Sequence, residues 1–317
     1  MKSQILLILV TLQFAVAFAQ DGKIISQKLH SITEKDRLPL IENFKGADTI
    51  LENTILEKIT YLSDNLKISG YVSKPKYNIK KLPCIIYCRG GNREFGAINS
   101  FEQFYLQRMA SWGYVVITSK YRGGPESEGK DEFGGSDVND VMNLLPALAQ
   151  IQNADTTKVG IHGWSRGGTM VYQALKRTRR FKGAVVGAGT ANFYTGISYR
   201  KDDFEAKVYA ELIPDYYKNK DVELKKRSAV FWADSISKTT PLLIMHGSSD
   251  WRVSPDESLE LVKKLYDAKH PTKFILYAGG DHGLRAYRRE TDAEMRKWFD
   301  DYVKNGKALP NMENHGK

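Results

Sequence analysis

The sequence has 317 residues, of which 42% are hydrophobic and 26% are charged. This length and composition suit one large α/β domain or two small ones, and they exclude collagen-like, disulfide-scaffold, disordered and multi-span membrane chains. Lys and Arg outnumber Asp and Glu by 47 to 37, for a formal charge of +10. Because the basic residues are scattered among acidic ones, without an aromatic-interleaved stripe, we expect a solvated basic surface and no nucleic-acid partner.

The N-terminal residues have the pattern of an export signal. Lys2 precedes an apolar run over residues 5–18, and Ala17-Phe18-Ala19 has the small-x-small pattern of a cleavage site. The run is too short and wrongly flanked for a spanning helix. We therefore expect residues 1–19 to be a signal peptide, cleaved after Ala19, and the mature protein to be secreted or periplasmic without an integral membrane segment. An uncleaved membrane anchor is the alternative.

In chain order, the first strong signal is an alternating pattern over residues 54–72, which predicts a hairpin that reverses at residues 63–65. Short apolar runs then predict buried strands at residues 84–88, 114–118, 158–162, 183–186, 242–245 and 273–277. Helical spacing of apolar residues predicts helices at residues 101–109, 138–148, 170–175, 255–265 and 286–303.

Local signals refine two of these helices. Ser136 is a candidate N-cap of the helix at residues 138–148, and Pro146 predicts a kink within it. Ser254-Pro255-Asp256-Glu257 is a capping box with Pro at the first helical position, which predicts where the helix at residues 255–265 begins.

Strands that alternate with helices at this spacing predict an α/β fold with a mostly parallel, doubly wound sheet. The alternation breaks over residues 190–240, a segment rich in Tyr, Phe and charge. We interpret this segment as a helical insertion above the carboxyl edge of the sheet, where α/β folds bind their ligands. The expected organisation is a signal peptide (1–19), an N-terminal segment (20–48) and one α/β domain (49–317).

The two cysteines, Cys84 and Cys88, lie in one predicted strand. Four residues along a strand separate their Cα atoms by roughly 13 Å, beyond the ~7 Å that a disulfide spans. Neither cysteine has a histidine close by at the spacing of a metal site. We therefore expect no disulfide between them within that strand, no cysteine nucleophile and no metal.

A candidate nucleophile lies between a predicted strand and a predicted helix, in the G-x-S-x-G sequence Gly163-Trp164-Ser165-Arg166-Gly167. Alone this match is weak, and its setting strengthens it. A sharp strand-to-helix turn leaves no room for a side chain at Gly163 or Gly167. The turn raises the Ser165 hydroxyl above the sheet and places the Trp164 or Arg166 amide near a developing oxyanion. A glycine-rich connection with an idle serine is the alternative.

A serine hydroxyl needs an imidazole to accept its proton. Of the six histidines, His282 follows the last predicted strand in the turn-rich loop Gly279-Gly280-Asp281-His282-Gly283, where a mobile base is expected. The other five lie in polar stretches, in the N-terminal segment or at strand ends: His270, His315, His30, His162 and His246. His282 is therefore the candidate base.

An acid that orients this histidine is expected at the carboxyl edge, between serine and histidine in chain order. Asp250 follows the predicted strand at residues 242–245 and meets both conditions. It would hold one tautomer of His282 and stabilise the imidazolium. An Asx-turn or cap aspartate is the alternative reading of Asp250. Asp281 is a competing acid, although adjacent residues in a tight turn rarely face each other productively.

Three motifs together resemble the catalytic domain of the prolyl oligopeptidase family of α/β-hydrolases: Gly-Trp-Ser-Arg-Gly-Gly, His-Gly-Ser-Ser-Asp-Trp-Arg-Val and Gly-Gly-Asp-His-Gly. Tyr121-Arg122-Gly123-Gly124 and residues 134–138 resemble the family's segment after the fourth strand. The likeness covers about residues 53–304. It implies Ser165 as nucleophile, Asp250 as acid and His282 as base. It also implies an α/β-hydrolase fold and acyl transfer from peptides or esters to water without a cofactor.

The sequence departs from the family's pattern in two places. Where the family often has Tyr or His before Gly-Gly-Pro, this chain has Arg89-Gly90-Gly91-Asn92. We therefore expect the oxyanion hole to use Trp164 together with the Arg89 or Gly90 amide or the Arg89 side chain, unless the two glycines only form a turn. The stretch between Gln20 and the first predicted strand is short, so we expect no β-propeller.

Taken together, the sequence predicts an exported serine hydrolase of prolyl-oligopeptidase type that cleaves short peptides or esters through an acyl-enzyme. A carbohydrate or small-molecule carboxylesterase on the same triad is one alternative. A non-catalytic binding protein on a hydrolase scaffold is the alternative from another class. The sequence implies no particular oligomeric state.

Overall fold

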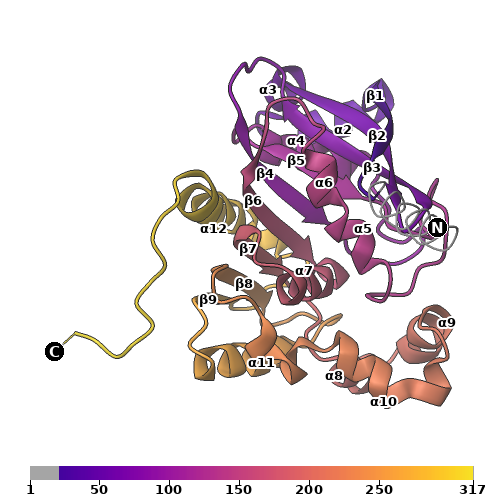
Figure 1. The fold of residues 1–317 in the computed structure, drawn as a ribbon, viewed down its shortest axis with the longest axis vertical. Helices are drawn as coiled ribbons and strands as arrows, with labels where there is room; N and C mark the ends of the chain where they lie inside the picture. The colour runs from indigo at the N-terminus through magenta and orange to yellow at the C-terminus, as the bar shows by residue number, and fades with distance from the viewer. Residues whose placement is uncertain (1–20, 317) are drawn as a thin grey trace, which may run out of the picture.

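The computed structural model describes residues 21–316, so the expected signal peptide at residues 1–19 lies outside the described residues. A nine-stranded sheet crosses the molecule in the order β1-β2-β3-β5-β4-β6-β7-β8-β9 (Figure 1). The first three strands are antiparallel, as is the pairing of β3 with β5: β1 (Ile24–His30), β2 (Thr54–Ser63) and β3 (Leu66–Pro75). The other six are parallel: β4 (Leu82–Cys88), β5 (Val115–Ser119), β6 (Ala154–Trp164), β7 (Phe181–Gly187), β8 (Leu242–Gly247) and β9 (Thr272–Tyr277).

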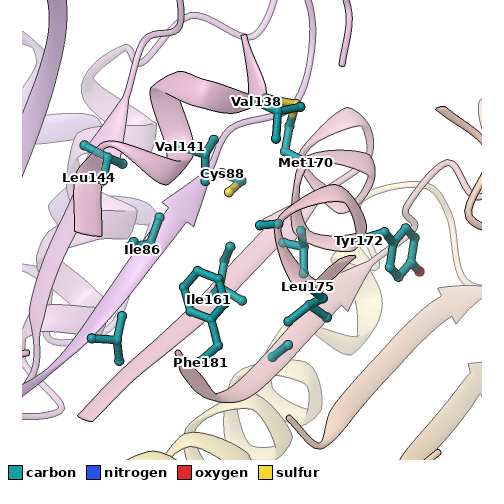
Figure 2. Close-up of a cluster of buried hydrophobic side chains, with 14 of the residues drawn as sticks. Ile86, Cys88, Val138, Val141, Leu144, Ile161, Met170, Tyr172, Leu175 and Phe181 are labelled. Atoms are coloured by element: carbon teal, nitrogen blue, oxygen red, sulfur yellow. The ribbon is translucent and has the colours of Figure 1, made fainter. Parts of the chain in front are cut away.

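Helices cover both faces of this sheet, because strands buried on both sides present apolar residues alternately to each face. One face packs against α5 (Val138–Met142), α6 (Leu144–Leu148), α7 (Arg166–Arg177) and α11 (Pro255–Asp267). The other packs against α4 (Ser100–Ala110) and α12 (Arg288–Phe299). In β4, Ile86 belongs to the first core and Ile85 to the second; Figure 2 shows Ile86 and Ile161 beneath α5, α6 and α7.

The fold confirms the expected doubly wound α/β architecture, and the local signals explain where several helices begin. Ser254 is the N-cap of α11, and its hydroxyl accepts a hydrogen bond from the Asp256 amide. The expected helix over residues 138–148 divides at Asn143 into α5 and α6. The expected cap was wrong, because Asp137 and not Ser136 precedes α5, and the Asp137 carboxylate accepts the Gly134 amide.

The N-terminal segment forms regular structure that periodicity did not predict. It contains β1 and α2 (Glu34–Asn43), and α3 (Ala47–Asn53) begins at its end. Strand β1 pairs with β2, and the two helices pack on α4 through a small cluster that includes Leu40, Ala47 and Phe104. The segment therefore extends both the sheet and the layer of helices around α4.

The segment between β7 and β8 is helical, as expected. It contains α8 (Phe193–Tyr199), α9 (Ala210–Leu212) and α10 (Tyr216–Arg227), which lie together at one side of the molecule (Figure 1). Its aromatic residues pack with Phe133, from the loop before α5, in a separate small core, in which Phe193 stacks on Tyr209 with ring centroids 5.0 Å apart. Within residues 21–316, no helix is both long enough and apolar enough to cross a bilayer.

Candidate active site

Ser165 lies at a sharp turn between β6 and α7. Its backbone has φ 56° and ψ −126°, a conformation that costs free energy for a residue with a side chain. A Cβ on Gly163 would lie 2.1 Å from the Gly167 carbonyl oxygen, and a Cβ on Gly167 would lie 2.0 Å from the Cys88 carbonyl oxygen. Both glycines are therefore required for the strand and the helix to approach this closely.

The first residue of α7 is held by a buried ion-pair network that periodicity does not indicate. The Arg166 guanidinium donates to Asp131 Oδ2 at 2.8 Å and Oδ1 at 2.7 Å, and also to Asp137. Burial alone would lower the pKa of Arg166, but the two carboxylates outweigh burial and raise it. The network fixes the start of α7 directly after Ser165.

His282 and Asp250 meet although they are 32 residues apart in the chain. His282 Nδ1 lies 2.7 Å from Asp250 Oδ2, while Asp250 Oδ1 accepts the amides of Arg252 at 2.8 Å and Val253 at 3.1 Å. Burial alone would raise the pKa of Asp250, but hydrogen bonds from His246 and His282 outweigh burial and hold it well below its ordinary value. Asp250 is therefore a buried carboxylate that stays ionised.

A second histidine, His246, contacts the same carboxylate from the buried side. Its Nε2 lies 3.1 Å from Asp250 Oδ2 and 3.1 Å from the Val253 carbonyl oxygen, and its Nδ1 lies 2.7 Å from Ser258 Oγ. Because the carboxylate and the carbonyl only accept, Nε2 must carry the proton. Sequence reasoning treated His246 only as a residue at the end of a strand.

Two other contacts tie the candidate residues together. The Trp164 indole donates to the His282 carbonyl oxygen at 2.8 Å, and the Tyr199 hydroxyl donates to the Asp250 carbonyl oxygen at 2.6 Å. The competing acid, Asp281, instead accepts the Arg285 amide at 2.9 Å. The nucleophile turn, the histidine loop and the helical segment after β7 are thus connected at one place.

Ser165 lies between two cavities. The histidine-side cavity, of about 540 Å³, is lined by Ser165 and His282 among others. The cap-side cavity, of about 340 Å³, is lined by Ser165, Arg166 and residues of the helical segment after β7 such as Tyr209. The structure therefore brings Ser165 and His282 to one cavity wall, with Asp250 behind the histidine. Their catalytic roles stay predictions.

Gly90 and the Arg89 side chain, two candidates for the second oxyanion donor, differ in where they lie. A Cβ on Gly90 would lie 3.4 Å from Ser165 Cβ, so the Gly90 backbone flanks the serine. The Arg89 side chain is excluded as a donor, because its guanidinium donates to the carbonyl oxygens of Lys120, Gly90 and Arg93 at 3.0–3.2 Å and is buried. The structure therefore contradicts the Arg89 side chain, which was one of the three expected sources of the second donor.

The two amides beside the serine differ in their surroundings. Trp164 is the last residue of β6, in register with Gly187 of β7. Arg166 begins α7, where an N–H has no carbonyl oxygen four residues earlier in the helix to bond. Both amides were candidates from the sequence. The Arg166 amide is better placed to donate a hydrogen bond to an oxyanion than the Trp164 amide.

The remaining histidines have other partners. His162 lies 2.9 Å from the Tyr105 hydroxyl oxygen and His270 lies 3.1 Å from the Ser237 carbonyl oxygen; burial lowers the pKa of each to about 4. His30 approaches Gln103 and His315 approaches the Glu313 carbonyl oxygen. In the part of the chain that the structure describes, no three His, Cys, Asp or Glu residues are arranged to hold a metal ion.

Comparison with known sequences places the chain beside peptidases. The prolyl oligopeptidase family matches residues 99–306. The chain is 27% identical to the uncharacterized peptidase YtmA of Bacillus subtilis, over 72% of this chain and 86% of YtmA. It is 24% identical to dipeptidyl-peptidase 5 of Porphyromonas gingivalis, over 84% of this chain but only 42% of that protein. The chain thus spans less than half of that longer relative.

Solved structures show the same fold. Acylaminoacyl peptidase of Pyrococcus horikoshii superposes with a TM-score of 0.70 at 23% identity, over 89% of this chain and 46% of that one. A puromycin hydrolase superposes with a TM-score of 0.67 at 19% identity, over 80% of this chain and 40% of that one. At this level of identity, both resemblances show the fold alone.

Proposed function

The chain belongs to the prolyl oligopeptidase family of hydrolases, and from that premise we propose that it is a serine peptidase that cleaves short peptides through an acyl-enzyme on Ser165. The observation that carries the proposal is the 2.7 Å contact between Asp250 and His282 beside a serine that lines the same cavity as the histidine. A buried, ionised Asp250 holds His282 Nδ1–H, which leaves Nε2 free to accept a proton.

The reaction follows from these positions. The Ser165 Oγ attacks the substrate carbonyl carbon while His282 Nε2 takes the hydroxyl proton, so that an O–C bond forms and a tetrahedral oxyanion develops. His282 then gives that proton to the leaving nitrogen as the C–N bond breaks. In the second half, a water molecule loses its proton to His282, attacks the ester carbon and releases the acid, and Ser165 Oγ regains a proton.

The oxyanion is expected to bind between the start of α7 and the loop after β4. We assign the Arg166 amide as one donor and the backbone at Gly90 as the source of the other. Removing one donor of this kind costs about 3–4 kcal/mol of transition-state stabilisation in serine hydrolases. Because the ion pairs of Arg166 fix the start of the helix, its amide requires little reorganisation during the reaction.

Export belongs to the same proposal and rests on the sequence of the first nineteen residues. The apolar run over residues 5–18 and the Ala17-Phe18-Ala19 motif support a signal peptide. N-terminal sequencing of the protein from the medium or periplasm of an expressing bacterium should begin at Gln20. Recovery only in the cytoplasm, with residue 1 or 2 at the N-terminus, would contradict export.

The central test compares wild type with Ser165→Ala. A fluorophosphonate should label the folded wild-type protein and not the variant, and the variant should lose about 10⁶ in turnover. Matched aminoacyl anilides and acetyl or butyryl esters then separate a peptidase from the carboxylesterase alternative by their kcat/KM. A folded wild type that resists labelling would leave the non-catalytic scaffold as the better interpretation.

A further inference from the structure

The two cavities beside Ser165 are expected to hold different halves of a substrate. In the mechanism proposed above, His282 protonates the nitrogen of the leaving fragment, so that fragment must depart on the side where the histidine is exposed. His282 lines the histidine-side cavity and not the cap-side cavity, whereas Ser165 lines both. The histidine-side cavity therefore receives the leaving fragment, and the cap-side cavity receives the acyl half.

The charges of the histidine-side cavity are mostly paired. Arg108 forms a bidentate pair with Asp292, at 2.7 and 2.9 Å. Glu102 accepts the Tyr87 hydroxyl at 2.6 Å, and burial raises the pKa of this carboxyl group, which disfavours its charge. These contacts leave little free negative charge on this wall.

Two more arginines stand closer to solvent or to the boundary between the cavities. Arg285 is largely exposed and lies 3.7 Å from Asp281. Arg252 lines both cavities and packs its guanidinium 5.0 Å from the Trp251 ring centroid and 5.4 Å from that of Phe95. Arg285 lines only the histidine-side cavity, but its side chain is largely exposed and faces Asp281, whereas Arg252 is shared by the two cavities.

Arg288 differs from all of these. It lines only the histidine-side cavity, and its guanidinium lies 5.0 Å from the Phe44 ring centroid and 5.4 Å from that of Phe101. Asp292, the aspartate of this wall, pairs with Arg108, and no carboxylate oxygen among residues 21–316 lies within ion-pair distance of Arg288. Burial and the nearby charge of Arg108 lower the pKa of Arg288, although the charge of Asp292 acts in the opposite direction.

The two rings also fix where Arg288 can point. Phe44 and Phe101 contact each other with centroids 5.6 Å apart, so the guanidinium rests on a preformed aromatic surface. A guanidinium stacked in this way keeps its N–H fork free for a planar anion such as a carboxylate. Phe44 follows α2, in the N-terminal segment that lies outside the family match at residues 99–306. This surface is thus built partly from residues outside the family match.

We propose that Arg288 binds a carboxylate carried by the leaving fragment, so that the preferred substrates are short peptides that release a fragment with a free carboxylate. The inference rests on the proposed function, because it takes its direction from the role of His282. The carboxylate can be the C-terminal α-carboxylate or an acidic side chain of the leaving fragment. Both present the same planar anion, and the test separates them.

The test uses peptides with one acyl half and three leaving fragments: one ending in a free carboxylate, one ending in a carboxamide, and one amidated fragment that contains Asp. A charge-assisted hydrogen bond contributes about 1.5–3 kcal/mol, so wild type should favour the carboxylate over the carboxamide by about 10- to 100-fold in kcat/KM. Arg288→Gln should remove that preference and leave hydrolysis of the carboxamide within about 2-fold of wild type, while Arg288→Lys should keep part of it.

Arg289→Gln is the matched control, because Arg289 is exposed, lies outside both cavities and carries the same charge. Equal wild-type rates on all three fragments, or a preference that survives Arg288→Gln, would overturn the inference. A preference for the amidated Asp fragment alone would assign Arg288 to a side-chain carboxylate. Fluorophosphonate labelling separates failure of the Arg288 inference from failure of the proposed function. If the wild-type protein is labelled but cleaves all three peptides equally, only the Arg288 inference is refuted. If the wild-type protein is not labelled, the proposed function is refuted as well.

Discussion

Asp250 accepts hydrogen bonds from two histidines, and only one of them faces a cavity. His282 Nδ1 approaches Asp250 Oδ2 from the solvent side, and His246 Nε2 approaches the same oxygen from the buried side at 3.1 Å. A carboxylate with two such donors is oriented as well as charged. If His282 is the base, His246 acts through Asp250 and is a positioning residue.

His246→Phe should therefore lower turnover without touching the substrate. The ring is kept, but the donor to Asp250 and the acceptor for Ser258 are lost, and a hydrogen bond to a charged group is worth about 1.5–3 kcal/mol. We expect kcat to fall about 10- to 100-fold with KM nearly unchanged, measured on an ester at saturating concentration. His246→Gln, which can still donate, should recover part of the loss.

His270→Phe is the control for a general loss of stability. His270 is also buried and lies 3.1 Å from the Ser237 carbonyl oxygen and 2.9 Å from Thr272 Oγ1, away from both cavities. It should lower the unfolding temperature and leave kcat unchanged. A similar drop in kcat for both variants would argue against a positioning role for His246.

These residues also show what sequence can predict at this scale. Ser165, Asp250 and His282 stand out because each follows a predicted strand beside turn residues, which is a local signal. His246 and Arg166 gain their partners only when β8 meets α11 and when α7 meets the loop before α5. Such contacts depend on the packing of distant segments, and no spacing in the sequence encodes them. The Arg89 side chain was misjudged for the same reason, since its acceptors are backbone carbonyl oxygens contributed by surrounding loops.

At the scale of elements, Glu257 joins α11 to the segment after β7. Its Oε2 accepts the amides of Ala191 and Asn192, each at 2.9 Å, while its Oε1 has no partner among the described residues. Burial raises the pKa of the Glu257 carboxyl group to about 8, although the two amides act in the opposite direction. The folded protein therefore keeps this group protonated at pH values where the unfolded chain, with a pKa of about 4.3, has released the proton.

The sign of the resulting pH dependence follows by linkage. A raised carboxyl pKa in the folded state means that folding binds a proton, so stability declines as pH rises from about 4 to about 8. Glu257→Gln removes that titration and keeps an oxygen for the two amides. We expect the variant to match wild type near pH 5 and to unfold several degrees higher at pH 8, measured by thermal unfolding at pH steps between them.

Glu260→Gln provides the comparison within the same helix, because Glu260 Oε2 accepts the Asn192 side-chain amide at 2.8 Å and is only half-buried. It should follow the wild-type pH dependence. The Asp250 carboxyl group gives stability a pH dependence of the opposite sign. Its pKa is lowered in the folded protein, so its contribution to stability is complete above about pH 4 and is lost as pH falls further. Identical curves for Glu257→Gln and wild type would contradict the role given to Glu257.

The turn between β6 and α7 depends on Gly167 most directly. Its Cβ would lie 2.0 Å from the Cys88 carbonyl oxygen, and backbone atoms cannot move aside as a flexible side chain can. Gly167→Ala should therefore separate α7 from β4, abolish fluorophosphonate labelling and lower the yield of folded protein. Gly283→Ala is the control, because its Cβ would meet only ordinary contacts at 3.5 Å or more, and it should fold normally. Full labelling of Gly167→Ala would contradict this account of the turn.

The accuracy of the expected elements varied with the strength of their periodicity. The parallel strands and α4 were predicted because apolar residues recur at the matching spacing in each. Strand β1 and helix α2 were missed: most of β1 is exposed or only partly buried, and α2 contains Pro39 and buries only Leu40. Such elements are stabilised by their position beside β2 and α4 rather than by a pattern of their own.

For the whole molecule, the family match covers residues 99–306, but the described fold does not begin there. Strands β1 to β4 complete one half of the sheet, and the loop after β4 brings Gly90 beside Ser165. The N-terminal segment also contributes Phe44, on which Arg288 rests. The site therefore depends on residues from before the matched region as well as within it, and truncation to residues 99–306 would remove both.

The same fold must be stable without a cross-link between its two cysteines. Cys84 and Cys88 are free and buried, and burial raises the pKa of Cys84 to about 12 and that of Cys88 further. Thiolate is the reactive form of cysteine. In the native protein, almost no cysteine should therefore react with an aromatic disulfide reagent, whereas both should react in the denatured protein. Reductant should leave the unfolding temperature unchanged, because the two hydrophobic cores on either face of the sheet supply the stability and both cysteines are free. Fewer than two thiols in denaturant, together with a lower unfolding temperature on reduction, would show that a disulfide contributes after all.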